Sequence, residues 1–260
     1  MDSYKTAKDL RDSDDFLTTG CDKIDALLRG GLSRRGINEI YGEAGCGKTQ
    51  LALQLCLSSQ IKKSNDQSTY TIYICTESIF PSKRLQELLK TSTISKSHKV
   101  SSDYILVEHV SKVTELETCI LEKIPTFLSN KKRKLGLIII DSIAAAYRVE
   151  YEENKLKNRA KSLRTIGHAL HKYSRLFNVC IVCLNQVSAV MDNPLGSFDH
   201  CQKLQPTLGL TWASQVTNSF CLCRFGDVRH FHVRDSSYLP RSTMSFEITT
   251  SGVQGLTDIT

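Results

Sequence analysis

The segment Gly42-Glu43-Ala44-Gly45-Cys46-Gly47-Lys48-Thr49 constrains this chain more than any other, because it matches the pattern G-x-x-x-x-G-K-[ST]. In such a loop the glycines allow backbone N–H groups to turn toward phosphate oxygens. The lysine reaches the β- and γ-phosphates, and the threonine hydroxyl holds Mg²⁺. The segment, together with the adjacent Gln50, therefore predicts a nucleotide-binding site with Mg²⁺ at Thr49.

The residues that flank this loop support the prediction. Residues 37–41 alternate as a strand does, and residues 50–59 have the composition of a mostly buried helix. A helix that begins at the loop adds the partial positive charge of its N-terminus where the phosphates would sit. The alternative, a glycine-rich turn that precedes a helix by chance, is disfavoured by this order of strand, loop and helix.

Composition limits the fold class and the compartment. The chain has 260 residues, of which 40% are hydrophobic and 23% charged, as is typical of soluble globular proteins. We expect a tail or linker over residues 1–17 and one core domain over residues 18–260. No apolar run is long enough for a membrane span, and the polar start does not resemble a signal peptide. We therefore expect no membrane association, and reduced core thiols at the cysteines.

Strand-like and helix-like segments alternate after the loop. Strands are predicted at 71–76, 104–110, 137–141 and 179–184, and helices at 82–90, 113–129 and 159–177, with a kink or an early end at Pro125. Shorter strands without long helices follow at 220–225, 230–234 and 245–250. This order predicts an α/β fold, with a mostly parallel central sheet flanked by helices and C-terminal antiparallel strands.

Polar side chains follow three of the predicted strands: Glu77, Asp141 with Ser142, and Gln186. In open α/β sheets ligands bind beyond the carboxyl ends of the strands, so these side chains should meet beside the phosphate loop. Asp141 suits the acid that completes the Mg²⁺ shell begun by Thr49. Glu77 suits a group that orients and deprotonates a water, and Gln186 suits a γ-phosphate sensor. The alternative for Glu77 and Gln186 is that they only cap or solvate strand ends.

Several segments resemble one known family. They are the loop at 42–49, the segment I-Y-I-C-T-E-S-I-F-P-S-K-R-L that ends at Leu85, L-I-I-I-D-S at 137–142 and L-N-Q-V at 184–187. Together they resemble the RecA-type strand-exchange recombinases of eukaryotes over nearly the whole chain. Within that family, L-L-R-G-G-L at 27–32, Y-I-C-T-E at 73–77, A-A-Y-R at 145–148 and L-G-L-T-W-A at 208–213 are similar to a recombinase paralogue.

The resemblance implies a RecA-type P-loop ATPase core that uses ATP and Mg²⁺. It implies that Lys48 and Thr49 bind the phosphates and Mg²⁺, that Glu77 is the catalytic carboxylate and that Asp141 is the second acidic site. It also implies that Arg84 stacks on the adenine, which a planar guanidinium suits. The alternative for Arg84 is a solvent-facing helix arginine.

The resemblance further implies a process and partners. It implies weak, DNA-dependent ATP hydrolysis in homologous recombination and DNA double-strand break repair, in the nucleus. The expected partners are single-stranded or branched DNA, and another recombinase paralogue or the main recombinase in a heteromeric complex.

Two predicted loops leave the strand ends beside the nucleotide site. The first covers residues 148–158 and carries Arg148, Lys155 and Lys157, and the second covers residues 188–208. In the resembled family both loops line the DNA channel, and the net charge of +7 fits a polyanionic partner. Glutamates in the first loop leave a second interpretation open, a solvated surface of mixed charge. The basic run at 131–134 is expected at the opposite edge of the sheet, as a solvated turn or a nuclear-import signal.

Three segments concern assembly. Tyr4-Lys5-Thr6-Ala7 has the aromatic-x-x-Ala form through which the resembled family polymerises. Trp212 falls where strand-exchange members carry a histidine that senses a neighbour's γ-phosphate, and an indole cannot accept a proton. This favours small heteromeric assemblies over long active filaments. Pro240 resembles a cap over a neighbour's nucleotide, or it simply ends a strand.

Three functions are compatible with these patterns. The leading one is a DNA-repair ATPase, and the first alternative is a nucleotide-gated scaffold with negligible ATP turnover. The site residues do not separate these two. A P-loop kinase is disfavoured, because Glu77 and Gln186 suit a water nucleophile and a sensor, and because no arginine-rich lid segment occurs.

Overall fold

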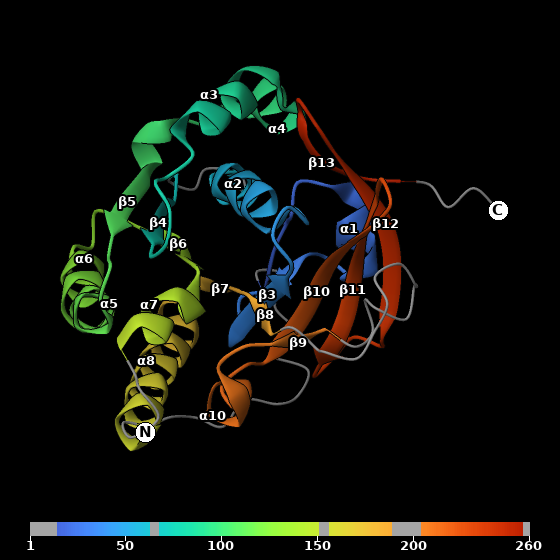
Figure 1. The fold of residues 1–260 in the computed structure, drawn as a ribbon. Helices are drawn as coiled ribbons and strands as arrows, with labels where there is room; N and C mark the ends of the chain where they lie inside the picture. The colour runs from blue at the N-terminus through green and yellow to red at the C-terminus, as the bar shows by residue number, and fades with distance from the viewer. Residues whose placement is uncertain (1–14, 63–67, 151–155, 189–203, 257–260) are drawn as a thin grey trace, which may run out of the picture.

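A long twisted sheet runs through the computed structural model, which describes residues 15–62, 68–150, 156–188 and 204–256 (Figure 1). Within these residues the sheet has nine strands. In spatial order they are β13 (Gly252–Gly255), β12 (Ser242–Thr249), β11 (Val228–Ser236), β10 (Asn218–Phe225), β3 (Ile37–Gly42), β7 (Cys180–Asn185), β6 (Leu135–Asp141), β4 (Tyr70–Cys75) and β5 (Ile105–His109).

The sheet has a parallel part and an antiparallel part. The pairs from β10 through β3, β7, β6 and β4 to β5 are parallel. Strands β10 to β13 form an antiparallel meander. Short connections join the meander strands, whereas helices join the parallel ones. Antiparallel neighbours can be linked by a tight turn, but parallel strands need a longer crossover connection. The predicted α/β fold, with a mostly parallel sheet and C-terminal antiparallel strands, is confirmed.

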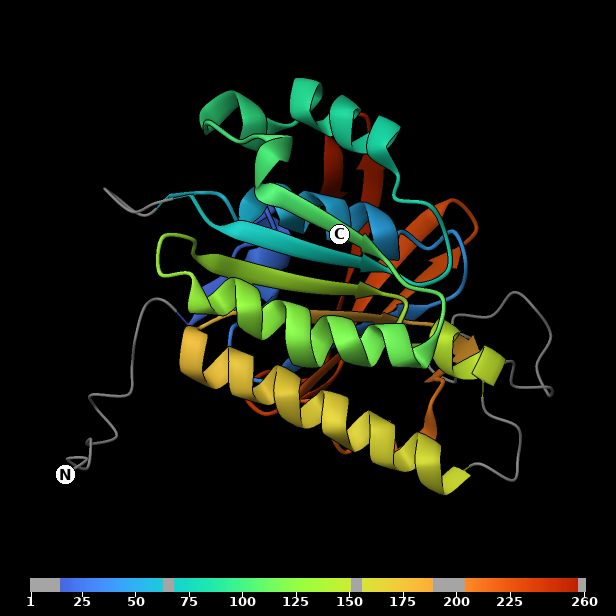
Figure 2. The same ribbon diagram turned by 90° about the vertical axis from the view of Figure 1, so that its left-hand side faces the viewer.

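Helices cover both faces of the parallel part (Figure 2). One face packs against α1 (Asp22–Leu27), α2 (Lys48–Ser58), α3 (Ser82–Thr91) and α4 (Thr93–Ser97). The other packs against α5 (Val113–Thr118), η2 (Cys119–Lys123), α6 (Ile124–Ser129), α7 (Ile143–Glu150), α8 (Leu156–Phe177) and α10 (Gly209–Ala213). The short elements are β1 (Phe16–Leu17) with β2 (Leu32–Ser33), β8 (Val187–Ser188) with β9 (Gln205–Pro206), and η1 (Ser102–Tyr104).

The apolar run of β6 shows why the sequence folds in this way. Leu137 and Ile139 join the core on the side of α2, while Ile138 and Ile140 join the core under α8. Successive side chains of a strand point to opposite faces, so a strand covered on both sides is apolar at every position. Burial on both faces leaves only the ends of β6 open to ligands, and its carboxyl end is Asp141.

The predicted helix over 113–129 is present with an irregularity. A π-helical segment, η2, separates α5 from α6, and Pro125 lies in the first turn of α6. Proline has no N–H to donate, so it fits best where a new helical stretch begins. The interruption expected at Pro125 is therefore confirmed, and it lies just before the proline.

Most of the described cysteines are free thiols. Among the described residues, eight are free and buried: Cys21, Cys46, Cys56, Cys75, Cys119, Cys180, Cys183 and Cys221. Cys223 is disulfide-bonded and departs from the expectation of reduced thiols. No helix in the described part of the chain combines the length and the apolar character needed to cross a bilayer.

Candidate nucleotide site

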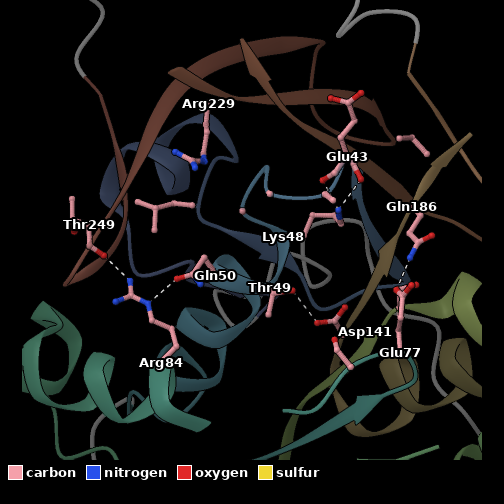
Figure 3. Close-up of a pocket in the computed structure, with 18 of the residues that line it drawn as sticks. Glu43, Lys48, Thr49, Gln50, Glu77, Arg84, Asp141, Gln186, Arg229 and Thr249 are labelled. Atoms are coloured by element: carbon pink, nitrogen blue, oxygen red, sulfur yellow. Dashed lines mark hydrogen bonds between the residues drawn. The ribbon is translucent and has the colours of Figure 1, made fainter. Parts of the chain in front are cut away.

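A cavity of about 1050 Å³ opens at the carboxyl ends of the parallel strands (Figure 3). Most of the predicted site residues line it: Gly42, Glu43, Ala44, Gly45, Gly47, Lys48, Thr49, Gln50, Glu77, Arg84, Asp141 and Gln186. Cys46 does not, because its side chain turns into the core and is 1% exposed. Residues separated by more than 140 positions in the sequence thus meet in one hollow.

The phosphate loop has a shape that only glycine permits at two positions. Gly45 and Gly47 have φ angles of 77° and 109°, a region that other residues rarely adopt. At Gly42 an added Cβ would lie 2.0 Å from the carbonyl oxygen of Leu222 on the neighbouring strand. The loop can therefore pass between β3 and α2 with its backbone exposed to a ligand.

The side-chain ammonium of Lys48 lies over this loop. Its Nζ donates hydrogen bonds to the carbonyl oxygens of Gly42 at 2.7 Å and Glu43 at 2.8 Å. The ammonium therefore lies beside the N-terminus of α2, which begins at Lys48 itself. A positive charge at a helix N-terminus attracts anions, and phosphate above all.

Asp141 lies deeper in the cavity, between two hydroxyl groups. Thr49 donates to its Oδ2 at 3.1 Å and Tyr73 donates to the same atom at 2.6 Å. Burial raises the pKa of Asp141, and the hydrogen bonds from Tyr73 and Thr49 and the charge of Lys48 oppose that rise. A divalent cation beside a buried carboxylate would favour its charged form, and oxygen ligands are those that Mg²⁺ prefers. The pair Thr49 and Asp141 therefore fits Mg²⁺.

Glu77 and Gln186 lie at the outer rim of the cavity. Gln186 donates its Nε2–H to Glu77 Oε2 at 2.5 Å, which joins the ends of β4 and β7. On its other side, Arg148 approaches Glu77 Oε1 at 3.4 Å, and these two side chains are 53% and 51% exposed. The sequence placed Glu77 and Gln186 near each other, whereas the contact with Arg148 was not predicted.

The basic residues of the first loop lie differently from the prediction. Arg148 belongs to the last turn of α7 and not to a loop, because the alanines before it are strong helix formers and extend the helix to Glu150. Lys157 is exposed in the first turn of α8, while Lys155 lies outside the described residues. Their contact with DNA stays a prediction.

Arg84 is tightly held at the other end of the cavity. It donates to Gln50 Oε1 at 2.8 Å and to the carbonyl oxygens of Thr249 at 2.6 Å and Thr250 at 3.1 Å, and it pairs with Glu87 at 2.5 Å. Its side chain is only 17% exposed. The solvent-facing alternative is therefore wrong, and stacking on adenine stays a prediction.

A buried carboxylate that sequence reasoning missed supports the rim from below. Glu39 accepts hydrogen bonds from Asn185 at 2.8 Å, from the Trp212 indole at 2.9 Å and from Ser219 at 3.2 Å. Burial raises the pKa of Glu39, and these three bonds oppose the rise. A glutamate inside the predicted strand at 37–41, directly before the phosphate loop, was the signal that could have revealed it.

The same network accounts for Trp212. This side chain is 1% exposed, and its N–H is committed to Glu39. It thus has a packing role inside the subunit.

Two further segments have predicted roles in assembly. Pro240 is exposed between β11 and β12, and Tyr4-Lys5-Thr6-Ala7 lies outside the described residues.

Comparison with known proteins agrees with this architecture. The Rad51 family model matches residues 11–256. The DNA repair protein XRCC3 of Bos taurus is 34% identical over 263 residues, which cover 92% of this chain and 74% of the relative. The Mus musculus protein of that name is 32% identical over 266 residues, with 92% and 75% covered. The DNA repair protein XRCC3 homolog of Arabidopsis thaliana is 31% identical over 280 residues, with 91% and 92% covered. With this match across nearly all of its length, the chain belongs to the Rad51 family and has its RecA-type ATPase domain.

Proposed function

We propose that this chain is an ATP-binding, DNA-dependent ATPase of the recombinase-paralogue type, acting in homologous recombination and double-strand break repair. The observation that supports it most is the phosphate loop folded between β3 and α2, with Thr49 3.1 Å from Asp141. Relatives named as DNA repair proteins support the process. The proposal includes a core domain over residues 18–260, location in the nucleus, and a heteromeric complex with another paralogue or the main recombinase.

The proposed nucleotide position follows from the two ends of the cavity. The loop at 42–49, Lys48 and Gln50 bind the phosphates, and Thr49 and Asp141 would hold Mg²⁺, which spreads the charge of the phosphates. Arg84 lies at the opposite end, where its guanidinium plane can face the adenine. The cavity thus separates a phosphate end from a base end.

The proposed reaction is attack of water on the γ-phosphorus. Glu77 accepts a proton from the attacking water as the new P–O bond forms and the bond to ADP breaks. Gln186 lies 2.5 Å from that carboxylate, so it can exchange its bond to Glu77 for one to the γ-phosphate. Hydrolysis then changes the hydrogen bonding of Gln186.

The same residue offers a route from nucleotide to DNA. Gln186 is followed directly by β8, which pairs with β9 at the base of the second predicted loop. Arg148 on α7 contacts Glu77 from the other side. We propose that ATP alters these two contacts and so couples nucleotide state to DNA or partner affinity. Equal DNA affinity with ATP, with ADP and without nucleotide would contradict this coupling.

Two measurements test the proposal. Calorimetry on the purified, folded protein should show Mg²⁺-dependent ATP binding, and its absence would overturn the whole proposal. Steady-state phosphate release should rise with single-stranded DNA. The Lys48→Ala variant should abolish this release, which controls for contaminating ATPases.

One observation favours a second candidate, a nucleotide-gated scaffold with negligible turnover. Both carboxylate oxygens of Glu77 already have a partner, Gln186 on one and Arg148 on the other. A carboxylate held in this way is less available as a base. Tight ATP binding without phosphate release, with and without DNA, would identify the scaffold.

A further inference from the structure

Arg229 is a cation of the cavity that neither the motif nor the strand ends predicted. It lies on β11, in the antiparallel meander, and its side chain lines the cavity together with the phosphate loop. Figure 3 shows it extending from the sheet toward the cavity, with Arg84 across from it. The Nε of Arg229 is buried, and no hydrogen-bond partner for it exists among the described residues.

The strand register explains how Arg229 comes so close to the loop. Arg229 lies directly opposite Phe246 in the pairing of β11 with β12, so the two side chains share one face of the sheet. That face covers the phosphate loop, because a Cβ added at Gly47 would meet Phe246 at 3.4 Å and Ile248 at 3.0 Å. Arg229 therefore reaches the nucleotide cavity from the wall that faces the loop.

The other cations near Arg229 have protein partners. Lys48 donates to two carbonyl oxygens of the loop, and Arg84 donates to Gln50 and to the end of β12. Arg224, the residue opposite Arg229 in the β10–β11 hairpin, donates to Gly226 O at 2.9 Å and to Asp227 at 3.1 Å. The two arginines of this hairpin therefore differ. Arg224 has acceptors for its guanidinium, whereas the buried Nε of Arg229 has none among the described residues.

A buried donor without an acceptor is costly, and an arginine fork matches phosphate oxygens well. We propose that Arg229 binds the phosphate chain of the nucleotide, as a second cationic contact beside Lys48 that the antiparallel meander supplies. This inference rests on the proposed nucleotide site and deepens it. It makes the C-terminal strands part of ligand recognition and not only a support for the parallel sheet.

The experiment compares Arg229→Gln with Arg224→Gln, which removes the same charge from the same hairpin at a residue that does not line the cavity. Affinities for fluorescent ATP, ADP and adenosine analogues are measured by titration, after thermal unfolding has shown that each variant is folded. We expect Arg229→Gln to weaken ATP and ADP binding about tenfold or more, as for a lost charge-assisted hydrogen bond, and to leave adenosine binding unchanged. Arg224→Gln should leave all three affinities unchanged.

Three outcomes would overturn the inference in distinguishable ways. If the unaltered protein binds no nucleotide, the proposed function fails together with the inference. If it binds ATP and Arg229→Gln binds ATP equally well, the inference alone fails. If Arg229→Gln weakens adenosine as much as ADP, the arginine contacts the nucleoside or shapes the wall, and the phosphate contact is wrong. Should Arg229→Gln fail to fold, the milder Arg229→Lys keeps the charge, loses the fork, and should show a smaller loss that is again confined to ATP and ADP.

Discussion

The floor of the nucleotide cavity and its outer rim are built in different ways. Asp141 on the floor is partly buried, and Glu39, which supports the rim from below, is fully buried; each accepts two or more hydrogen bonds. At the rim, Glu77 is half exposed and has one short bond of 2.5 Å to Gln186 and one long contact of 3.4 Å to the half-exposed Arg148. Multiple buried bonds fix a geometry, whereas an exposed pair contributes little stability and separates easily. The floor is therefore suited to hold a nucleotide, and the rim to respond to it.

The largest effect is expected at the floor, for Lys48→Ala. Loss of the ammonium leaves the phosphates without their principal charged partner, so ATP affinity should fall more than about 100-fold. Calorimetry with Mg²⁺ and ATP measures it. Lys123→Ala is the control, because Lys123 is an exposed lysine that pairs with Glu108 and does not line the nucleotide cavity. Retained ATP affinity in Lys48→Ala would move the phosphates away from this loop.

A separation of binding from turnover is expected at the rim, for Glu77→Gln. Glutamine keeps the size of the side chain and cannot accept the proton, so phosphate release should fall about 100-fold while ATP affinity stays within about threefold. Single-turnover hydrolysis and calorimetry report the two quantities. Unchanged turnover would show that Glu77 does not act as the base.

A stability effect of about 2 kcal/mol is expected beneath the rim, for Glu39→Ala. The change leaves one N–H of Asn185 and the indole N–H of Trp212 buried without an acceptor, while Asn185 keeps its other bond to the carbonyl oxygen of Thr207. Each such unpaired group is costly. Glu39→Gln is the matched control, because its carbonyl oxygen can take both bonds while its amide donates to Ser219. Chemical denaturation should therefore give a lower free energy of unfolding for Glu39→Ala than for Glu39→Gln. Equal losses of stability in the two variants would contradict the hydrogen-bond network.

The same residue gives a pH dependence. The folded protein holds the Glu39 proton more tightly than the unfolded chain, whose pKa is near 4.5. This contribution to stability is present below the unfolded pKa and is lost as the pH rises through the raised folded pKa. As the pH rises above about 4.5, the unaltered protein should thus lose stability relative to Glu39→Gln. Parallel stability curves for the two proteins would show that Glu39 does not titrate differently in the folded state.

The smallest effect is expected for Arg148→Gln. An exposed pair contributes less than about 1 kcal/mol, so unfolding should hardly change. If Arg148 neutralises one phosphate of single-stranded DNA, the slope of log affinity against log salt should fall by about 0.7. Arg175→Gln, an exposed charge in the last turn of α8, serves as the control. Equal slopes for both variants would show that Arg148 does not neutralise a DNA phosphate.

The parts of the fold and of the site that the sequence predicted depend on local patterns and on one general rule for parallel sheets. The phosphate loop and its helix depend on adjacent residues, and the ends of β4, β6 and β7 converge by the general rule for parallel sheets. The apolar runs predicted these strands, so Glu77, Asp141 and Gln186 could be placed near the loop. The family match supports the same architecture.

The features that the sequence did not predict depend on contacts that no local pattern encodes. Arg229 reaches the cavity only because β11 and β12 fold back beside the loop in a particular register. The end of α7 at Arg148 was read as a loop because charged residues follow it, although the alanines before it carry the helix onward. Glu39 was not predicted as a site residue, because its three partners come from distant segments.

One wall of the cavity comes from the end of β12, with Ile248 and Thr249, and from Thr250, which follows the strand. During synthesis the phosphate loop leaves the ribosome about two hundred residues before this wall exists. A nascent chain therefore cannot form the finished pocket until residue 250 has been synthesised. ATP can stabilise the completed protein by mass action, but it cannot guide the early folding of the segment that binds its phosphates.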